Sequence, residues 1–213
     1  MNLILFGPPG AGKGTQAKYI VKNFNYIQLS TGDLLRNEIE TKSELGLKID
    51  KIISRGDFVS DSDVNELIKL SITKLKFQKP IIFDGYPRNM SQVKHLESIL
   101  SKCNQKISFV IFLNVSKEII EKRIKGRVTC RKCNTTLNKF FNKQEIENHT
   151  CGKEFLERRQ DDDKETAISR YDTYMNKTKP VLDFYSSKKG FYEIDGNLKI
   201  HQIGNKINEI LKV

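Results

Sequence analysis

Short apolar runs alternate with longer polar segments along most of the chain. The runs lie at residues 2–6, 26–29, 80–84, 107–114 and 191–194. The segments between them show helical patterns. Strands that read as continuous apolar runs are typical of parallel sheets, which helices bury on both faces. The pattern therefore predicts an α/β fold built on a parallel five-stranded sheet.

Polar residues that favour helix N-termini mark where several helices begin. They stand at Thr31–Asp33, at Ser60–Asp63 and at Ser116, each ahead of an apolar helical pattern. A long helix is expected from about Asp163 to Ser187. Pro180 should kink this helix or start a new one, because proline removes a hydrogen bond and clashes with the preceding turn.

Two segments depart from the alternation of strand and helix. Residues 30–59 are helical but contain no strand, which predicts an inserted helical flap. Residues 126–162 hold three of the four cysteines and show no clean helical period, which predicts a small subdomain held together by a metal ion. The remaining segments, 1–29, 60–125 and 163–213, form the predicted core domain.

The chain carries a dispersed positive charge, with a formal net charge of +11. Because the lysines are spread along the chain, this excess favours a solvated surface over a nucleic-acid interface. No apolar run approaches the ~20 residues of a membrane span, and the N-terminus shows no signal-type segment. We therefore expect a cytoplasmic protein with neither a nucleic acid nor a membrane as its partner.

Residues 7–15, Gly-Pro-Pro-Gly-Ala-Gly-Lys-Gly-Thr, lie between the first apolar run and a helical segment over 13–24. A strand, a glycine-rich turn and a helix N-terminus in this order form a phosphate-binding loop. The glycines let backbone N–H groups approach a phosphate, and Lys13 adds positive charge there. Thr15 is the candidate hydroxyl near Mg²⁺. A turn that merely requires glycine is the alternative.

A carboxylate, Asp84, ends the apolar run at 80–84. Beside a phosphate-binding loop, an acid in this place is suited to hold Mg²⁺ through water. An aspartate that only caps a turn is the alternative. Asp33 is a second candidate, although Thr-Gly-Asp is also a good helix cap.

Arginines occur near these motifs, although the chain otherwise prefers lysine. They are Arg36, Arg88, Arg123, Arg127, Arg159 and Arg170. A guanidinium fork can bind phosphate through two hydrogen bonds, which suits phosphoryl transfer. Arg88 follows a stiff Gly85–Pro87 turn, and Arg123 and Arg127 share one helix face if the helix continues through Gly126. The alternative for each is an ordinary surface arginine.

Four motifs together resemble those of the adenylate kinases in order and spacing. They are Gly7–Thr15, Ser30–Arg36, Asp84–Asn89 and Arg159–Asp162, and Asp195–Gly196 also fits. The resemblance covers essentially the whole chain and looks like the bacterial form with a long, cysteine-bearing lid. It implies a P-loop kinase core, a flap at 30–59 that binds a nucleoside monophosphate (NMP), and a lid at 126–162.

The resemblance also implies roles for individual residues. ATP would be held by Gly10, Ala11, Gly12, Lys13, Gly14, Thr15, Arg123, Arg127, Thr136, Leu137 and Leu198. AMP would be held by Thr31, Arg36, Asp57, Phe58, Val59, Gly85, Tyr86, Pro87, Arg88, Gln92, Arg159 and Arg170, with Gln92 reading the adenine edge. The catalytic set would be Lys13, Asp84, Arg88, Arg123, Arg159 and Arg170. Asp161 and Asp162 would orient the arginines or stabilise the closed lid.

The lid cysteines form an irregular metal site. Cys130-x-x-Cys133 is a regular first half, but the second half offers only Cys151. His149 is the best available fourth ligand. Asn148 falls at the usual spacing but is a poor ligand, and Glu154 is the other alternative. Three thiolates and one imidazole would hold a structural Zn²⁺ in tetrahedral geometry.

Two further positions depart from the family's pattern. Tyr86 replaces a phenylalanine, which is tolerable if its hydroxyl finds water. Leu137 replaces an aromatic residue, which would weaken nucleobase stacking in the lid.

The resemblance implies reversible phosphoryl transfer, ATP + AMP = 2 ADP, with Mg²⁺, by a monomer whose partners are ATP, AMP and ADP. Catalysis would come from placing two nucleotides in line and surrounding the moving group with positive charge. A kinase for another NMP is one alternative, against which Thr31 and Gln92 favour adenine. A zinc-ribbon nucleic-acid-binding protein is the other, but it leaves the phosphate-binding loop unexplained.

Overall fold

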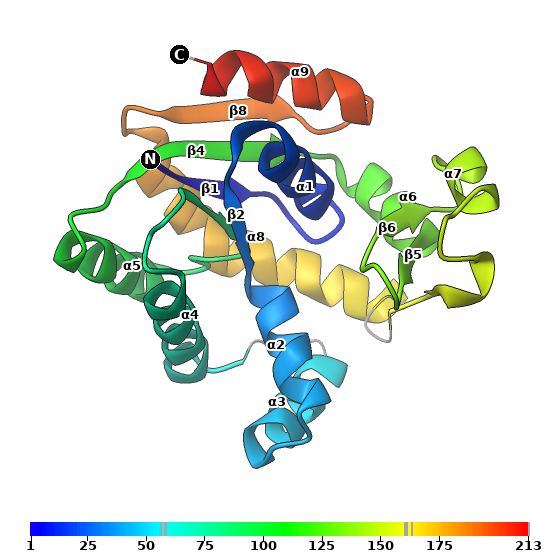
Figure 1. Cartoon of the computed structure of the whole chain (residues 1–213), viewed down its shortest axis with the longest axis horizontal. Coiled ribbons are helices and arrows are strands. Elements are labelled where there is room, and N and C mark those ends of the chain that lie inside the picture. The colour runs from blue at the N-terminus through cyan, green and yellow to red at the C-terminus, as the bar shows by residue number, and fades with distance from the viewer. Residues whose placement is uncertain (56, 58, 160–161, 163, 213) are drawn as a thin grey trace.

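The computed structural model describes residues 1–55, 57, 59–159, 162 and 164–212, without the side chains of residues 164–167 and 170. Within these residues, five parallel strands form one sheet in the order β2-β3-β1-β4-β8 (Figure 1). The strands are β1 (Asn2–Phe6), β2 (Ile27–Ser30), β3 (Ile81–Asp84), β4 (Ile107–Asn114) and β8 (Phe191–Asp195). Each predicted apolar run forms one of them, which confirms the α/β fold and its parallel sheet.

Helices cover both faces of the sheet (Figure 1). One layer contains α1 (Lys13–Phe24), α6 (Lys117–Gly126) and α9 (Ile200–Leu211), and the other contains α4 (Asp61–Leu75), α5 (Met90–Lys102) and α8 (Lys164–Ser186). Side chains alternate between the faces along a strand. In β1, Leu3 and Leu5 therefore face the first layer, whereas Ile4 and Phe6 face the second.

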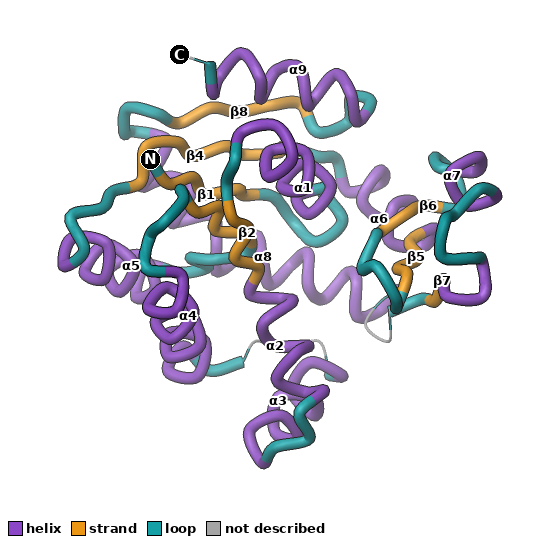
Figure 2. Tube along the Cα trace, viewed as in Figure 1, coloured by secondary structure: helices purple, strands orange, loops and turns teal. Residues whose placement is uncertain are grey.

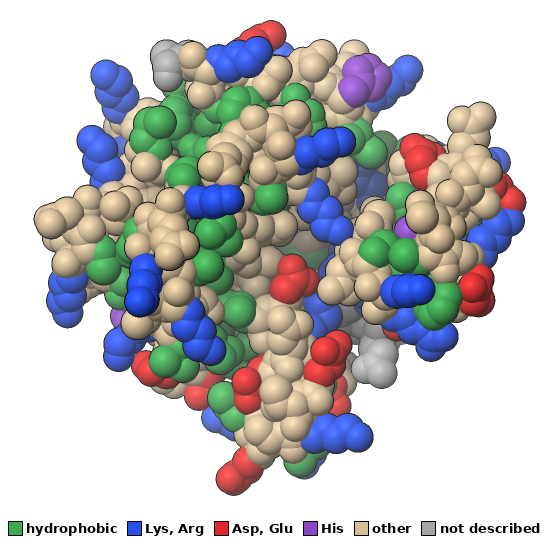
Figure 3. All heavy atoms as spheres, viewed as in Figure 1, with side chains coloured by type: hydrophobic (Ala, Val, Ile, Leu, Met, Phe, Trp, Pro, Cys, Tyr) green, Lys and Arg blue, Asp and Glu red, His purple; other side chains and the backbone are tan. Residues whose placement is uncertain are grey.

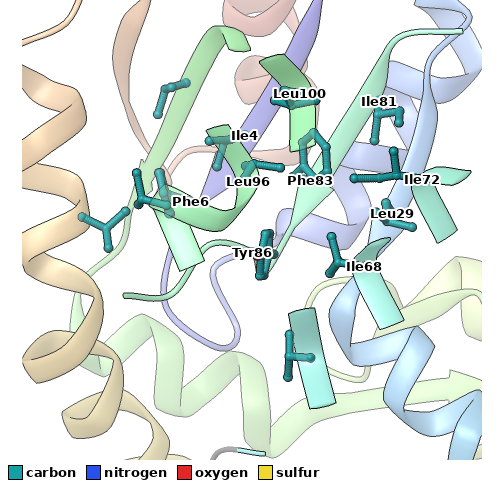
Figure 4. Close-up of a cluster of buried hydrophobic side chains, with 14 of the residues drawn as sticks. Ile4, Phe6, Leu29, Ile68, Ile72, Ile81, Phe83, Tyr86, Leu96 and Leu100 are labelled. Atoms are coloured by element: carbon teal, nitrogen blue, oxygen red, sulfur yellow. The ribbon is translucent and has the colours of Figure 1, made fainter. Parts of the chain in front are cut away.

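The second layer has the larger buried cluster. Figure 4 shows Ile4 and Phe83 of the sheet beside Ile68 of α4 and Leu96 of α5. All four side chains are 0% exposed. Complete burial of such a side chain contributes roughly 1.5–3 kcal/mol, so this contact holds the two helices against β1 and β3.

Several helices begin where the sequence predicts, although the cap of α2 is Ser30, one residue before the predicted Thr31–Asp33. Ser30 accepts a hydrogen bond from the Asp33 N–H at the start of α2 (Thr31–Glu40), and Ser60 accepts one from the Asp63 N–H at the start of α4. Ser116 precedes α6 as expected, but its side chain makes no capping hydrogen bond. These caps satisfy N–H groups that have no partner within the helix.

The long helix forms as predicted, but the expected break at Pro180 is wrong, because α8 continues from Lys164 to Ser186 with Pro180 inside it and no new helix starts there. Thr178 and Val181, on either side of the proline, are 1% and 0% exposed. Burial of this helix against the sheet offsets the hydrogen bond that proline removes.

The two inserted segments have different structures. Residues 30–59 contain α2 and α3 (Glu44–Ser54) and, among the described residues, no strand beyond Ser30, as expected. Residues 126–162 contain a three-stranded antiparallel sheet in the order β6-β5-β7 (Figure 2), which the sequence did not reveal. The elements of this segment are β5 (Arg127–Cys130), β6 (Thr136–Asn138), α7 (Lys143–Glu147), the 3₁₀ helix Lys153–Phe155 and β7 (Leu156–Glu157).

None of the helices in the described part of the chain combines the length and the apolar character needed to cross a bilayer.

Candidate active site

The loop between β1 and α1 has the geometry of a phosphate cradle. Gly10 and Gly12 adopt positive φ angles of 85° and 94°, which other residues rarely adopt. A Cβ at Gly10 would also lie 3.0 Å from Ile124 of α6. At Gly14, in contrast, a Cβ would meet no atom of the described residues within 4 Å, so a ligand can approach the backbone there. Gly10 and Gly12 thus allow the loop's backbone conformation, Gly10 also allows close packing against α6, and Gly14 leaves the backbone accessible to a ligand.

Lys13, the first residue of α1, turns back over this loop. Its Nζ donates hydrogen bonds to the carbonyl oxygens of Gly7, at 2.7 Å, and Pro8, at 3.1 Å. The ammonium group and the N-terminal end of the helix therefore place positive charge at the same point.

Asp84 lies at the carboxyl end of β3 and is 8% exposed. Gln28 Nε2 donates a hydrogen bond to Asp84 Oδ2 at 2.9 Å. Burial raises the pKa of the Asp84 carboxyl, and the nearby charges of Lys13 and Arg88 only partly offset it. An ionised carboxylate here gains from a bound cation, so the residue is suited to hold Mg²⁺.

The turn after β3 places Arg88 near the loop. Gly85 has a φ of 79°, and a Cβ there would lie 2.7 Å from Thr31 Oγ1. Thr31 Oγ1 and Arg88 Nε both donate hydrogen bonds to the Gly85 carbonyl, at 3.0 and 2.8 Å. These contacts join the start of the flap to Arg88.

A cavity of about 40 Å³ lies where the loop and this turn meet. Its lining includes Gly7 and Lys13 on one side and Gly85 and Arg88 on the other. Two segments with phosphate-binding chemistry, far apart in sequence, therefore face one small space.

Tyr174 and Thr178 of α8 also line the cavity, and the sequence analysis missed them. Thr178 Oγ1 donates a hydrogen bond to the Arg88 carbonyl at 3.1 Å. Tyr174 is 7% exposed, and burial raises the pKa of its hydroxyl. Their four-residue spacing from Arg170 is the signal that could have found them, although the Arg170 side chain lies outside the described part.

The AMP residues predicted on the flap are only partly brought to the site. Arg36 pairs with Asp33 on its own helix. Val59 is 7% exposed, and its side chain packs into the core. Asp57 is exposed, and its N–H donates to the Ile52 carbonyl at 3.2 Å. Phe58 lies outside the described residues.

Tyr86 and Gln92 are both buried beneath the turn. The Tyr86 hydroxyl donates to Asn65 Oδ1 at 2.7 Å, so a side chain of α4 supplies the partner that the hydroxyl needs. Gln92 Oε1 accepts from the Arg88 N–H at 2.7 Å, and its Nε2 donates to Asp61 Oδ1 at 2.7 Å.

Arg123 and Arg127 do not share a helix face, because the condition for it, a helix that continues to Arg127, is not met. The helix ends at Gly126, and Arg127 begins β5. Arg123 donates to the carbonyl oxygens of Ala11, at 3.1 Å, and Gly196, at 2.7 Å, and burial lowers its pKa. It is therefore anchored at the phosphate-binding loop.

The lid arginines are held by lid residues. Arg127 Nε donates to Asp162 Oδ2 at 2.7 Å, which is the contact expected if Asp162 orients an arginine. Arg159 donates to the hydroxyls of Thr129 and Thr136, at 3.2 and 3.4 Å. Figure 3 shows basic side chains around the hollow at the centre of this face.

The residues predicted to contact the adenosine of ATP come from two separate elements. Thr136 and Leu137 belong to β6 of the lid, and Leu198 lies between β8 and α9. The Leu198 side chain is partly buried against the first core layer, and the predicted contact with ATP is one of its backbone.

Four lid residues converge on one point. The ligand atoms of Cys130, Cys133, His149 and Cys151 lie within 4.8 Å of one another, and Cys133 Sγ is 3.7 Å from His149 Nε2. Two sulfurs on a tetrahedral Zn²⁺ are about 3.8 Å apart, from Zn–S bonds of about 2.3 Å. The group can therefore hold a metal ion, and Glu154 is not part of it.

The thiols also show why a cation would be favourable. Burial and the neighbouring thiols of Cys133 and Cys130 raise the pKa of Cys151 to about 11. Three thiolates so close together repel one another unless a cation is bound.

Comparisons with known proteins show the family to which the chain belongs. A family model for adenylate kinase matches residues 5–190. An adenylate kinase of Pelagibacter ubique (strain HTCC1062) is 63% identical over 213 residues, covering 100% of both chains. One of Erythrobacter litoralis (strain HTCC2594) is 39% identical over 214 residues and covers 100% of both. One of Thermosipho melanesiensis is 37% identical over 215 residues, covering 100% of this chain and 99% of the relative.

Proposed function

The chain belongs to the adenylate kinase family and interconverts ATP plus AMP with two ADP, and we propose that residues 7–15 and 85–88 bring the two nucleotides together for this reaction. The observation that carries the proposal is the cavity between these segments, lined by Lys13 on one side and Arg88 on the other. A phosphate bound by each segment would meet the other in this space.

The ATP side is built around the loop. Gly10, Ala11, Gly12, Lys13, Gly14 and Thr15 would surround its phosphates. Arg123, anchored at the Ala11 carbonyl, would add charge from α6. Arg127, Thr136, Leu137 and Leu198 would complete the site from the lid and from the segment after β8.

The AMP side is built on the turn after β3 and on the flap. Gly85–Arg88, Thr31 and Gln92 would hold AMP beside the core. Arg36, Asp57, Phe58 and Val59 would contact it from the flap, and Arg159 and Arg170 would neutralise its phosphate.

The transfer itself needs no covalent enzyme intermediate. An oxygen of the AMP phosphate attacks the γ-phosphorus of ATP, and the bond to the bridging oxygen breaks, leaving its electron pair on ADP. Lys13, Arg88 and Arg123 would stabilise the negative charge around the moving group. When bound with ATP, Mg²⁺ neutralises charge on the outer phosphates, and Asp84 and Thr15 would hold it there.

We assign the flap to residues 30–59 and the lid to 126–162, with the rest as the core. Closure of both over the nucleotides would exclude water, which otherwise would compete with AMP for the phosphoryl group. The buried pair of Arg127 and Asp162 would stabilise the closed lid.

The direct test is a panel of acceptors. With ATP as donor, we expect AMP to be preferred over CMP, UMP and GMP, with ADP as the product. A clear preference for another monophosphate would favour the alternative of a different NMP kinase. The zinc-ribbon alternative has no support, because the adenylate kinase family model matches residues 5–190, which include the whole phosphate-binding loop. Cytoplasmic location, a monomeric state and independence from nucleic acids and membranes stay predictions.

We also propose that Cys130, Cys133, His149 and Cys151 bind a structural Zn²⁺. The lid sheet is too small to bury a core of its own, so a metal ion would supply its stability. Cys130→Ser should reduce bound zinc from about one ion per chain to none and lower the melting temperature by about 5 °C. Metal analysis and thermal unfolding measure both effects.

Cys103→Ser is the matched control, because Cys103 is exposed and lies outside the cluster. It should keep both zinc and melting temperature. If Cys130→Ser retains its full metal content, Cys130 is not a ligand.

A further inference from the structure

A carboxylate at the start of α4 holds two amide side chains of α5. Asp61 Oδ1 accepts hydrogen bonds from Gln92 Nε2 at 2.7 Å and from Asn89 Nδ2 at 2.9 Å, and Asp61 Oδ2 accepts from the same Asn89 atom at 3.0 Å. Asn89 in turn caps α5, because its Oδ1 accepts from the Gln92 N–H at 2.9 Å. Asp61 therefore reaches Gln92 both directly and through the helix cap.

These contacts fix which way the Gln92 amide points. Its Nε2 faces a carboxylate, which accepts hydrogen bonds, and its Oε1 faces the Arg88 N–H, which donates one at 2.7 Å. A rotated amide would place oxygen against oxygen at Asp61 and N–H against N–H at Arg88. The side chain is 3% exposed, so water cannot easily replace either partner.

The fixed amide still has capacity for a ligand. An amide nitrogen carries two hydrogens and an amide oxygen two lone pairs, and the two contacts use one of each. The remaining N–H and lone pair match adenine, whose amino group donates and whose ring nitrogen accepts. They oppose hypoxanthine, whose O6 accepts and whose N1–H donates.

We propose that Asp61 is a positioning residue that sets the purine specificity of the acceptor site by locking the Gln92 amide in the adenine-reading orientation. The inference rests on the proposed function, in which Gln92 contacts the base of AMP. It explains why a carboxylate at the flap–core junction is directed at a buried glutamine rather than at a basic side chain.

Asp61→Asn tests the inference. Asparagine can turn its N–H₂ group toward Gln92 while its oxygen still accepts from Asn89, whereas a carboxylate can only accept. A rotated Gln92 amide, with its oxygen toward residue 61, is then no longer opposed. We expect kcat/KM for AMP to fall about tenfold and the ratio of kcat/KM for IMP to that for AMP to rise about tenfold. The KM for ATP should stay within about twofold of the wild-type value. IMP is the informative probe, because it differs from AMP only at the edge that Gln92 would read.

Asp63→Asn is the matched control. Asp63 lies in the same first turn of α4, but its carboxylate bonds to Ser60 and Lys48 rather than to Gln92. This variant should keep the wild-type ratio between IMP and AMP. A general loss of charge at this helix N-terminus would instead affect both variants alike, and would overturn the inference.

The outcomes separate this inference from the proposed function. If the wild-type protein does not prefer AMP, the assignment of the acceptor site is wrong. If it prefers AMP but Asp61→Asn keeps the wild-type ratio, Asp61 has no role in specificity, whatever its effect on stability. Should Asp61→Asn fail to fold, Asp61→Ser takes its place, because serine removes the carboxylate that opposes a rotated Gln92 amide. An unchanged ratio in that variant also overturns the inference.

Discussion

Lys13→Met is expected to lower turnover about a thousandfold while the protein remains folded. Lys13 Nζ lies 2.7 Å from the Gly7 carbonyl and lines the cavity opposite Arg88. In this position it would follow the negative charge of the transferred group through the transition state. Loss of one preorganised donor typically costs 10²- to 10³-fold in kcat, and here a full positive charge is lost as well.

Steady-state kinetics of the variant would measure this effect, with thermal unfolding as the check on folding. Lys22→Met is the matched control, since Lys22 is an exposed residue in the last turn of the same helix. It should turn over at nearly the wild-type rate. Near-normal turnover of Lys13→Met would show that Lys13 does not act on the transferred group.

The core of the fold could be predicted because its signals are local. A strand buried on both faces must be apolar throughout, as Ile81–Phe83 are, so it reads as one continuous run. Ser30 and Ser60 bond to backbone N–H groups only three residues away, so capping also leaves a local mark. The phosphate-binding loop combines both kinds of signal with glycines at positive φ angles.

The features that sequence reasoning missed depend on distant contacts. The end of α6 is one case. Gly126 lies beneath Asn138 and Phe140 of the lid, and a Cβ there would come within 2.5 Å of both side chains. That contact explains why a glycine stands at the end of the helix, but both partners lie in a different element of the lid. The sequence alone therefore could not show that the helix ends before Arg127.

The candidate site shows the same limit. Lys13, Asp84 and Arg88 could be predicted because each lies in a motif at the end of a strand or the start of a helix. Tyr174 and Thr178 reach the cavity only because α8 packs across the sheet. The lid strands β6 and β7 have three and two residues, too few to show a period. In the lid, the Cys130-x-x-Cys133 spacing was the signal that predicted a folded subdomain.

Asp84→Asn is expected to stabilise the free protein while lowering its Mg²⁺-dependent turnover by at least about a hundredfold. Burial raises the pKa of Asp84 above its ordinary value of 3.8, so the folded protein holds this proton more tightly than the unfolded chain does. Below the pKa of Asp84 in the unfolded chain, the carboxyl is protonated in both states and does not lower the free energy of unfolding. As the pH rises through the folded pKa, ionisation becomes costlier in the folded state, and stability falls.

Asparagine has nearly the same shape and cannot ionise, and its oxygen can still accept the hydrogen bond from Gln28. The free energy of unfolding should therefore rise by about 1 kcal/mol at pH 7, or 2–4 °C in melting temperature, and the gain should shrink as the pH falls toward 4. Thermal unfolding from pH 4 to 8, without nucleotide or Mg²⁺, measures this. Asp195→Asn is the control, because Asp195 also ends a strand but is exposed.

A loss of stability in Asp84→Asn at pH 7 would mean that the carboxylate is already well compensated by Lys13 and Arg88, and so has no need of a metal ion. A gain in stability in Asp84→Asn but not in Asp195→Asn would show that Lys13 and Arg88 do not fully compensate the carboxylate. The core would then carry an uncompensated negative charge at the carboxyl end of β3, in the cavity's immediate surroundings, which only a substrate-bound cation relieves. The instability of the free enzyme and its capacity to bind Mg²⁺ with ATP would have the same physical cause.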